Sequence, residues 1–353
     1  GNDAVVFDAL AQLAFEAGTR ANELAAAEAY AELALAFVTR SRRGDDGRGR
    51  VLLVVGQTRE RAGDIAGART ALQASEAAFA AAGTLDLPGR LPLWIALALV
   101  DELDGDLAGA ERRYDDARRR IELAYGDNHP DVAVALEYLA IVRRKRGAYD
   151  EALAAAERSR TIRSAVLGDQ HNETAVALDI IGNVNIDLRR WDEAETALGA
   201  AIAIWRAHAP EHRGLALAEG ALAEVHMLRG QPAEALLGYR KALALAERTL
   251  GDDHPELAIF LVGIGSCELA LGRPGDAIAP LERAARSIGE TRGDPMLRAH
   301  VEVTLAQALV RSGGDRQRAR TLVDAARRDN AKVGQLAESG RMAQEIDATA
   351  AEL

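Results

Sequence analysis

Residues 250–258 read Leu-Gly-Asp-Asp-His-Pro-Glu-Leu-Ala, and related segments stand at 126–130 (Gly-Asp-Asn-His-Pro) and at 168–172 (Gly-Asp-Gln-His-Asn). In each segment the glycine can end one helix and the polar residues can cap the next. Proline suits the first turn of the helix that follows. The three segments therefore predict junctions between consecutive helices.

A self-similar pattern of about 42 residues surrounds these junctions. Its anchor column, mostly glycine, holds Ala21, Gly63, Gly105, Gly147, Arg189, Gly230, Gly272 and Gly313. Alanine follows five residues after each anchor, or six after the last, at Ala26, Ala68, Ala110, Ala152, Ala194, Ala235, Ala277 and Ala319. A pair of one aliphatic and one small residue begins eight residues before each anchor, at Leu13-Ala14, Val55-Gly56, Leu97-Ala98, Leu139-Ala140, Ile181-Gly182, Leu222-Ala223, Ile264-Gly265 and Leu305-Ala306. The pattern predicts eight repeat units.

The residue types in these columns are those that two closely crossing helices need. A small side chain at the contact lets antiparallel helices approach, its aliphatic neighbour fills the core, and a glycine ends the first helix. Each unit is predicted to hold a first helix of about 15 residues, a turn and a second helix of about 18 residues. Only 4% of the 353 residues are aromatic and nine are proline, which also favours an all-α chain. The charged stretch 40–50 is predicted to be a loop joining the first two units.

The units resemble the tetratricopeptide repeat, most clearly at 147–152 (Gly-Ala-Tyr-Asp-Glu-Ala) and 190–194 (Arg-Trp-Asp-Glu-Ala). The 42-residue period, with the segment 250–258, resembles the kinesin light chain subclass. The resemblance covers Leu10 to about Asn330. It implies a right-handed superhelical solenoid of about eight antiparallel helix-turn-helix repeats in residues 1–330, with degenerate outer repeats. Residues 331–353 are predicted to form a capping helix through Val333, Leu336, Met342 and Ile346.

The resemblance also implies a concave groove lined by the first helices, at positions ten, six, three and two before each anchor. In the middle units these positions hold polar residues of both charges. The predicted partner-binding residues are Glu137, Ile141, Arg144, Lys145, Asp179, Asn183, Asp187, Glu224 and Met227. In the next unit they hold Val262, Ser266, Leu269 and Ala270, so we expect a more apolar groove there. Two interpretations stay open, because these side chains could line an open groove or could contact one another or the C-terminal helix.

Four histidines recur at the same position of successive units, which bears on whether a metal is bound. They are His129, His171, His212 and His254. Consecutive hairpins stack roughly 8–10 Å apart, whereas zinc-bound nitrogens lie about 2 Å from the metal, so single histidines in a row make a poor metal site. We predict that they cap helices, and we expect no metal and no cofactor. The single Cys267 cannot form an internal disulfide.

Composition and motifs restrict the function classes. The formal net charge of −11 disfavours a nucleic-acid surface. The longest apolar run, 91–100, is about half of the roughly 20 residues that cross a bilayer, so we expect no membrane insertion and a cytoplasmic chain. No catalytic motif is found, which predicts a protein that is not an enzyme.

We expect instead a scaffold that binds a protein or peptide segment in the first-helix groove. Alanine- and arginine-rich arrays of this kind resemble the C-terminal regions of large bacterial serine/threonine kinases, which implies an interaction or regulatory domain of a larger signalling protein. Two alternatives stay open. One is a ligand- or peptide-sensing regulatory domain, and the other is self-association at the solenoid ends.

Overall fold

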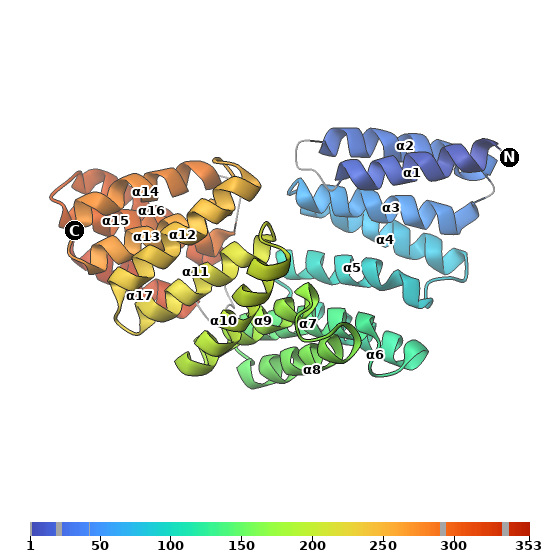
Figure 1. The fold of residues 1–353 in the computed structure, drawn as a ribbon. Coiled ribbons are helices and arrows are strands. Elements are labelled where there is room, and N and C mark those ends of the chain that lie inside the picture. Colours follow the sequence, from blue (N-terminus) through green and yellow to red (C-terminus); the bar gives the residue numbers. More distant parts are fainter. Residues whose placement is uncertain (1, 19–22, 42, 290–293, 334–338) are drawn as a thin grey trace. The chain divides into compact units, whose positions relative to one another are not determined.

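The structure is a computed structural model that describes residues 2–18, 23–41, 43–289, 294–333 and 339–353. Every regular element in these ranges is a helix (Figure 1). The chain forms two compact units, residues 1–142 and 143–353. The prediction of an all-α chain is therefore confirmed.

The first unit holds three helical hairpins and most of α7, the helix that follows them. Its elements are α1 (Asn2–Gly18), α2 (Leu24–Ser41), α3 (Gly44–Arg61), α4 (Ile65–Ala81), the 3-10 turn η1 (Pro88–Arg90), α5 (Leu91–Leu103), α6 (Leu107–Tyr125) and α7 (Pro130–Lys145). Helix α1 packs on α2, α3 on α4, and α5 on α6. Consecutive helices thus pair as the repeat pattern predicts.

The second unit begins within the last turn of α7 and continues the array. Its elements are α8 (Tyr149–Leu167), α9 (Asn172–Asp187), α10 (Trp191–His208), α11 (Arg213–Leu228), α12 (Pro232–Leu250), α13 (Leu257–Ala270), α14 (Pro274–Ile288), α15 (Pro295–Arg311), α16 (Arg316–Val333) and α17 (Ser339–Ala351). Helix α9 packs on α10, α11 on α12, α13 on α14, and α15 on α16. In the described residues, no helix combines the length and apolar character that a bilayer crossing requires.

The anchor column marks the turn inside each hairpin. All seven anchors in the described residues have positive φ, from 57° at Arg189 to 85° at Gly105. Glycine reaches this left-handed region without steric cost and so ends the first helix, as predicted. Arg189 adopts the same conformation with a side chain. The eighth predicted anchor, Ala21, lies outside the described residues.

The small-residue column marks the closest approach of the two helices in a hairpin. An added Cβ on Gly182 of α9 would stand 2.5 Å from Cγ of Leu198 on α10. In the same way, an added Cβ on Gly265 of α13 would stand 2.6 Å from Cγ of Leu281 on α14. Because these distances are shorter than any real carbon contact, glycine is required for the leucine to fit. The predicted helix contact is confirmed.

The alanine column is correct in seven units and wrong in the first. The seven later alanines are fully buried, whereas Ala26 is exposed and its neighbour Ala27 is fully buried. The buried alanine of the first unit is therefore one residue later than predicted. A shift of one residue turns a side chain by about 100° around a helix, which moves it out of the core.

The predicted loop at 40–50 is also wrong. Helix α2 continues to Ser41 and α3 begins at Gly44. Two glycines of α3 make room for aromatic rings, because an added Cβ on Gly49 would stand 2.7 Å from the Phe79 ring and one on Gly47 would stand 3.1 Å from Phe7. These glycines serve packing instead of a turn.

The C-terminal segment ends the array with one unpaired helix. Helix α16 ends at Val333, so this residue belongs to α16. Helix α17 packs against α15 and α16. Met342 and Ile346 of α17 are buried against the core of the last hairpins. The predicted contact residue Leu336 lies outside the described residues.

Candidate functional site

Four predicted binding residues lie close together at the end of α7 and along α9, and we call them the polar cluster: Arg144, Asp179, Asn183 and Asp187. Nε of Arg144 donates to Oδ2 of Asp187 at 2.5 Å. The Asp187 side chain is 7% exposed and that of Arg144 is 32% exposed. The guanidinium therefore holds a buried carboxylate while part of its own surface faces solvent.

Asp179 contributes a buried carboxyl to the polar cluster. Its Oδ1 is buried without a hydrogen-bond partner. Burial raises the pKa of Asp179 from 3.8 to about 7, although Arg144 and Asn183 act in the opposite direction. One turn further on, Nδ2 of Asn183 donates to the Asp179 main-chain oxygen at 2.9 Å. The cluster can thus donate and accept hydrogen bonds, and near neutral pH one of its carboxyls changes charge.

The five remaining predicted residues are dispersed. Glu137, which is buried, and Ile141, which is partly exposed, belong to the first unit. In the second unit Lys145 and Glu224 are exposed. Met227 is partly buried, with its Sδ 3.9 Å from Sγ of Cys267 on α13.

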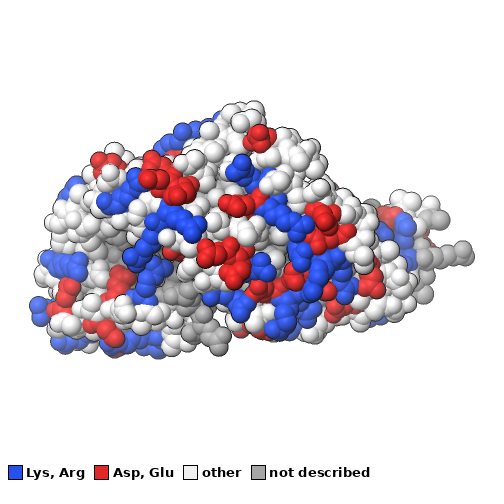
Figure 2. Space-filling model, turned by 90° about the horizontal axis from the view of Figure 1, so that it is seen from below, with Lys and Arg blue, Asp and Glu red and all other residues white. Residues whose placement is uncertain are grey.

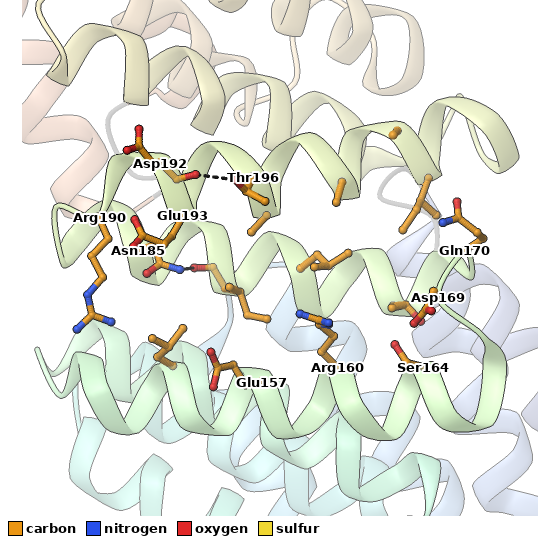
Figure 3. Close-up of a pocket in the computed structure, with 18 residues that line it drawn as sticks. Glu157, Arg160, Ser164, Asp169, Gln170, Asn185, Arg190, Asp192, Glu193 and Thr196 are labelled. Carbon is orange, nitrogen blue, oxygen red and sulfur yellow. Dashed lines mark hydrogen bonds between the residues drawn. The ribbon is translucent and has the colours of Figure 1, made fainter.

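A groove that sequence reasoning missed lies between the second helices α8 and α10, with α9 as its floor (Figure 3). Its volume is about 900 Å³. Leu178 and Ile181 of α9 and Leu153 of α8 give it an apolar lining. We call this space the second-helix groove.

Helix α10 forms one wall of the second-helix groove with small side chains. Ala197, Ala200 and Ala203 line it at intervals of three residues. The two repeat positions that hold Ala200 and Ala203 hold Arg283 and Arg286 in α14. Because α4 also holds alanine at both positions, Ala74 and Ala77, these alanines alone could not have revealed the groove from the sequence.

The second-helix groove and the polar cluster use different faces of α9. Successive residues of a helix are turned by about 100°, so Leu178, Ile181 and Asn185 share one face. Asp179, Asn183 and Asp187 share a face turned by about 150° from it. One helix therefore contributes to two separate surfaces.

Three of the four recurring histidines, His129, His171 and His212, stand directly before a helix and cap it, whereas His254 lies two residues before the cap residue of α13, Glu256. In each of the four, Nδ1 accepts a hydrogen bond from the main-chain N–H two residues further on, at 3.2 Å for His129, 3.2 Å for His171, 3.0 Å for His212 and 3.3 Å for His254. His212 also stacks on Trp205, with ring centroids 5.0 Å apart, and burial lowers its pKa. The capping prediction is confirmed for His129, His171 and His212, and for His254 only the hydrogen bond recurs, because α13 begins two residues later than the repeat predicts. The described residues contain no group of three or more His, Cys, Asp or Glu side chains that could hold a metal ion.

Charged residues of both signs are interspersed on the face drawn in Figure 2. Many of them pair between helices, as in Arg240 with Glu268 at 2.9 Å and Arg283 with Glu247 at 2.5 Å. No broad region of one sign is visible on that face. Some of the surface charge is thus used in contacts between neighbouring helices.

Comparisons with known proteins agree with this geometry. A family model described as tetratricopeptide repeat matches residues 90–165, 132–207 and 214–287, which together make up more than half of the chain. No curated protein shows a significant match.

Several solved structures share this fold. One is a Rap protein complexed with Competence and Sporulation Factor, which is 15% identical and has a TM-score of 0.64, with 100% of this chain and 99% of that chain covered. Another is the apo form of RapI, which is 15% identical and has a TM-score of 0.59, with 81% and 98% covered. A third is BtubC (BKLC) from P. vanneervenii, which is 20% identical and has a TM-score of 0.52, with 64% and 89% covered. Kinesin light chain-like repeat proteins are among the matched structures. At these identities the likeness concerns the fold alone.

Proposed function

The chain belongs to the tetratricopeptide repeat family, and from this premise we propose that it is a non-catalytic scaffold whose polar cluster binds a protein or peptide segment. The observation that carries the proposal is the buried Oδ1 of Asp179, which has no hydrogen-bond partner. A buried polar atom of this kind normally has a partner in the complete assembly.

The polar cluster has the chemistry to bind a peptide main chain. A peptide offers alternating N–H donors and C=O acceptors. Asp179 accepts when ionised and also donates when protonated, and the exposed part of Arg144 donates. Lys145, Glu224 and Met227 would add contacts to the side chains of the partner.

We also propose that the scaffold is the interaction arm of a larger bacterial signalling protein. The support is the resemblance of its alanine- and arginine-rich repeats to the C-terminal regions of bacterial serine/threonine kinases. The shared fold with a Rap protein complexed with Competence and Sporulation Factor agrees with the binding of another molecule by such an array.

Photo-crosslinking tests the position of the site. A photoreactive residue at Asn183 should crosslink a protein or peptide in an extract of the cells that produce this chain, whereas one at the exposed control position Glu32 should not. The captured partner, once purified, should then bind the double variant Asn183→Ala/Asp179→Arg at least about tenfold more weakly than it binds the wild type.

Two further variants keep the test decisive if the double variant misfolds. Asn183→Ala alone and Asp179→Asn change hydrogen bonding without introducing a second cation beside Arg144. Circular dichroism establishes that each variant is folded. Unchanged affinity in folded variants would show that the partner binds elsewhere.

A further inference from the structure

The second-helix groove has the length of a chain segment. On its floor helix α9 the lining residues extend from Thr174 to Asn185, which corresponds to roughly 17 Å at about 1.5 Å per residue. Its volume of about 900 Å³ is near the upper end of the range for ligand pockets, about 300–1,000 Å³. A trough between two parallel walls with an apolar floor fits an elongated segment better than a compact small molecule (Figure 3).

The walls favour a helix over an extended strand as the occupant. The alanines of α10 at 197, 200 and 203 are short enough for another helix to approach to the usual 8–10 Å between axes. Leu153 on the opposite wall and Leu178 on the floor are partly exposed. These leucines can enter the spaces between side chains on an apolar helix face, which is the way helices pack.

Two polar groups in the groove have hydrogen-bonding capacity that the described residues do not use, and one of them is buried. Asn185 donates from its Nδ2 to the Ile181 main-chain oxygen at 3.0 Å, while its Oδ1 accepts no hydrogen bond in the described residues and is not among the buried atoms. Near the other end, Oγ of Ser164 is buried without a partner. A segment lying along the groove can supply donors at both places.

The charges along the rim favour a basic occupant. Glu157, Asp169 and Glu193 line the groove, and in the part of the chain that the structure describes their carboxylates form no ion pair. One guanidinium, that of Arg160, lines it without an ion pair in the same ranges. The other charges are already used, since Asp192 pairs with Arg229 and Arg190 lies 3.5 Å from Asp150. The free rim charges are therefore mainly negative.

We infer that the second-helix groove is a docking site for an amphipathic α-helix of a partner protein, with an apolar stripe against α9 and Lys or Arg side chains along its edges. The site is separate from the polar cluster, because it uses the other face of α9. A helix here would complete the hydrogen bonds of Asn185 and Ser164 and neutralise the rim carboxylates.

A display library of 18-residue segments tests the inference on the full chain. The library is selected on the wild type and counter-selected on Ala200→Arg, whose long side chain would fill the groove. The selected segments should carry apolar residues at helical spacing, three and four apart, and an excess of Lys and Arg. By fluorescence polarisation, a synthetic selected peptide should bind Ala200→Arg at least about tenfold more weakly than it binds the wild type.

Matched variants distinguish the groove from general effects. Ala244→Arg adds the same side chain at an exposed position of α12 that does not line the groove, and it should leave affinity unchanged. Glu157→Lys combined with Glu193→Lys should weaken the basic peptide more than tenfold, whereas Glu32→Lys should not. Asp179→Asn alters the polar cluster alone and should not affect this peptide.

Three results would overturn the inference. They are the selection of no segment, the selection of segments without helical periodicity or basic excess, and equal binding to the wild type and to folded Ala200→Arg. If Asp179→Asn no longer bound the selected peptide, the polar cluster would be part of the peptide site. This result would also contradict the inference, which treats the groove and the polar cluster as separate sites. Failure of the polar cluster to bind a partner would leave the groove result unaffected.

Discussion

Arg144 and Asp187 are 43 residues apart, yet Nε of the first lies 2.5 Å from Oδ2 of the second. A repeat of about 42 residues brings equivalent positions of successive first helices side by side, so residues one repeat apart become neighbours. The pair therefore couples α7 to α9 at the centre of the polar cluster.

Removing Arg144 should be more damaging than removing the charge of Asp187. Arg144→Met leaves a carboxylate that is 7% exposed without its ion-pair partner, and we expect a loss of about 2 kcal/mol in the free energy of unfolding. Asp187→Asn leaves the Arg144 guanidinium without its carboxylate, but this guanidinium is partly exposed and can be hydrated. The loss in the free energy of unfolding should therefore be smaller than for Arg144→Met. Urea unfolding of both single variants and of the double variant gives the coupling energy, expected to be about 1 kcal/mol or more. Additive effects would mean that the ion pair contributes no coupling.

Asp179 should make stability depend on pH in the neutral range. Its pKa is about 7 in the folded chain and near 3.8 in the unfolded chain, so between these values the folded chain holds a proton that the unfolded chain has released. The stability from the neutral carboxyl is fully present below pH 3.8 and is lost as the pH rises through 7. Asp179→Asn cannot ionise, so its advantage over the wild type should grow by on the order of 2 kcal/mol between pH 5 and pH 8.

The measurement is urea unfolding of both proteins across this pH range. A carbon-detected NMR titration of the Asp179 carboxyl provides the independent check, with an expected midpoint near 7. A midpoint near 4, or a stability difference that does not change with pH, would contradict the assignment.

The repeat columns predicted the hairpins because each column reports a local requirement. An anchor such as Gly230 is needed where φ is positive, and Gly182 is needed where Leu198 approaches. These requirements act within one hairpin, so a single sequence shows them. The first unit departs from the alanine column, because Ala27 is buried there in place of Ala26.

What could not be predicted depends on several helices at once. The glycines at 47 and 49 look like turn residues until Phe7 and Phe79 are placed against them. The second-helix groove needs the side chains of three helices to be placed before its volume is evident. That Arg144, Asp179 and Asn183 bind a partner stays a prediction.

Arg189 offers a test of the anchor column, because it is the non-glycine anchor in the described residues. Its φ of 57° places it in the left-handed region, which costs an L-residue roughly 1 kcal/mol relative to glycine. Arg189→Gly should therefore raise the free energy of unfolding by about 1 kcal/mol. Gly230→Ala is the converse change, since φ is 75° and an added Cβ would meet no atom within 4 Å. It should lower stability by a similar amount, and equal stability of all three proteins in urea would refute the backbone explanation.

Gly182 tests the helix contact that defines each hairpin. In Gly182→Ala the added Cβ would stand 2.5 Å from Leu198, so one of the two helices must shift, at a cost of about 1–3 kcal/mol. Leu198→Ala alone removes a fully buried side chain and should cost about 2–5 kcal/mol through the cavity that it leaves. In the double variant the new methyl group enters the space that the leucine vacates. The stability loss of the double variant should therefore be smaller than the sum of the two single-variant losses, by about 1 kcal/mol. Thermal and urea unfolding of the four proteins measure this coupling, and simple additivity would show that the glycine is not there to admit the leucine.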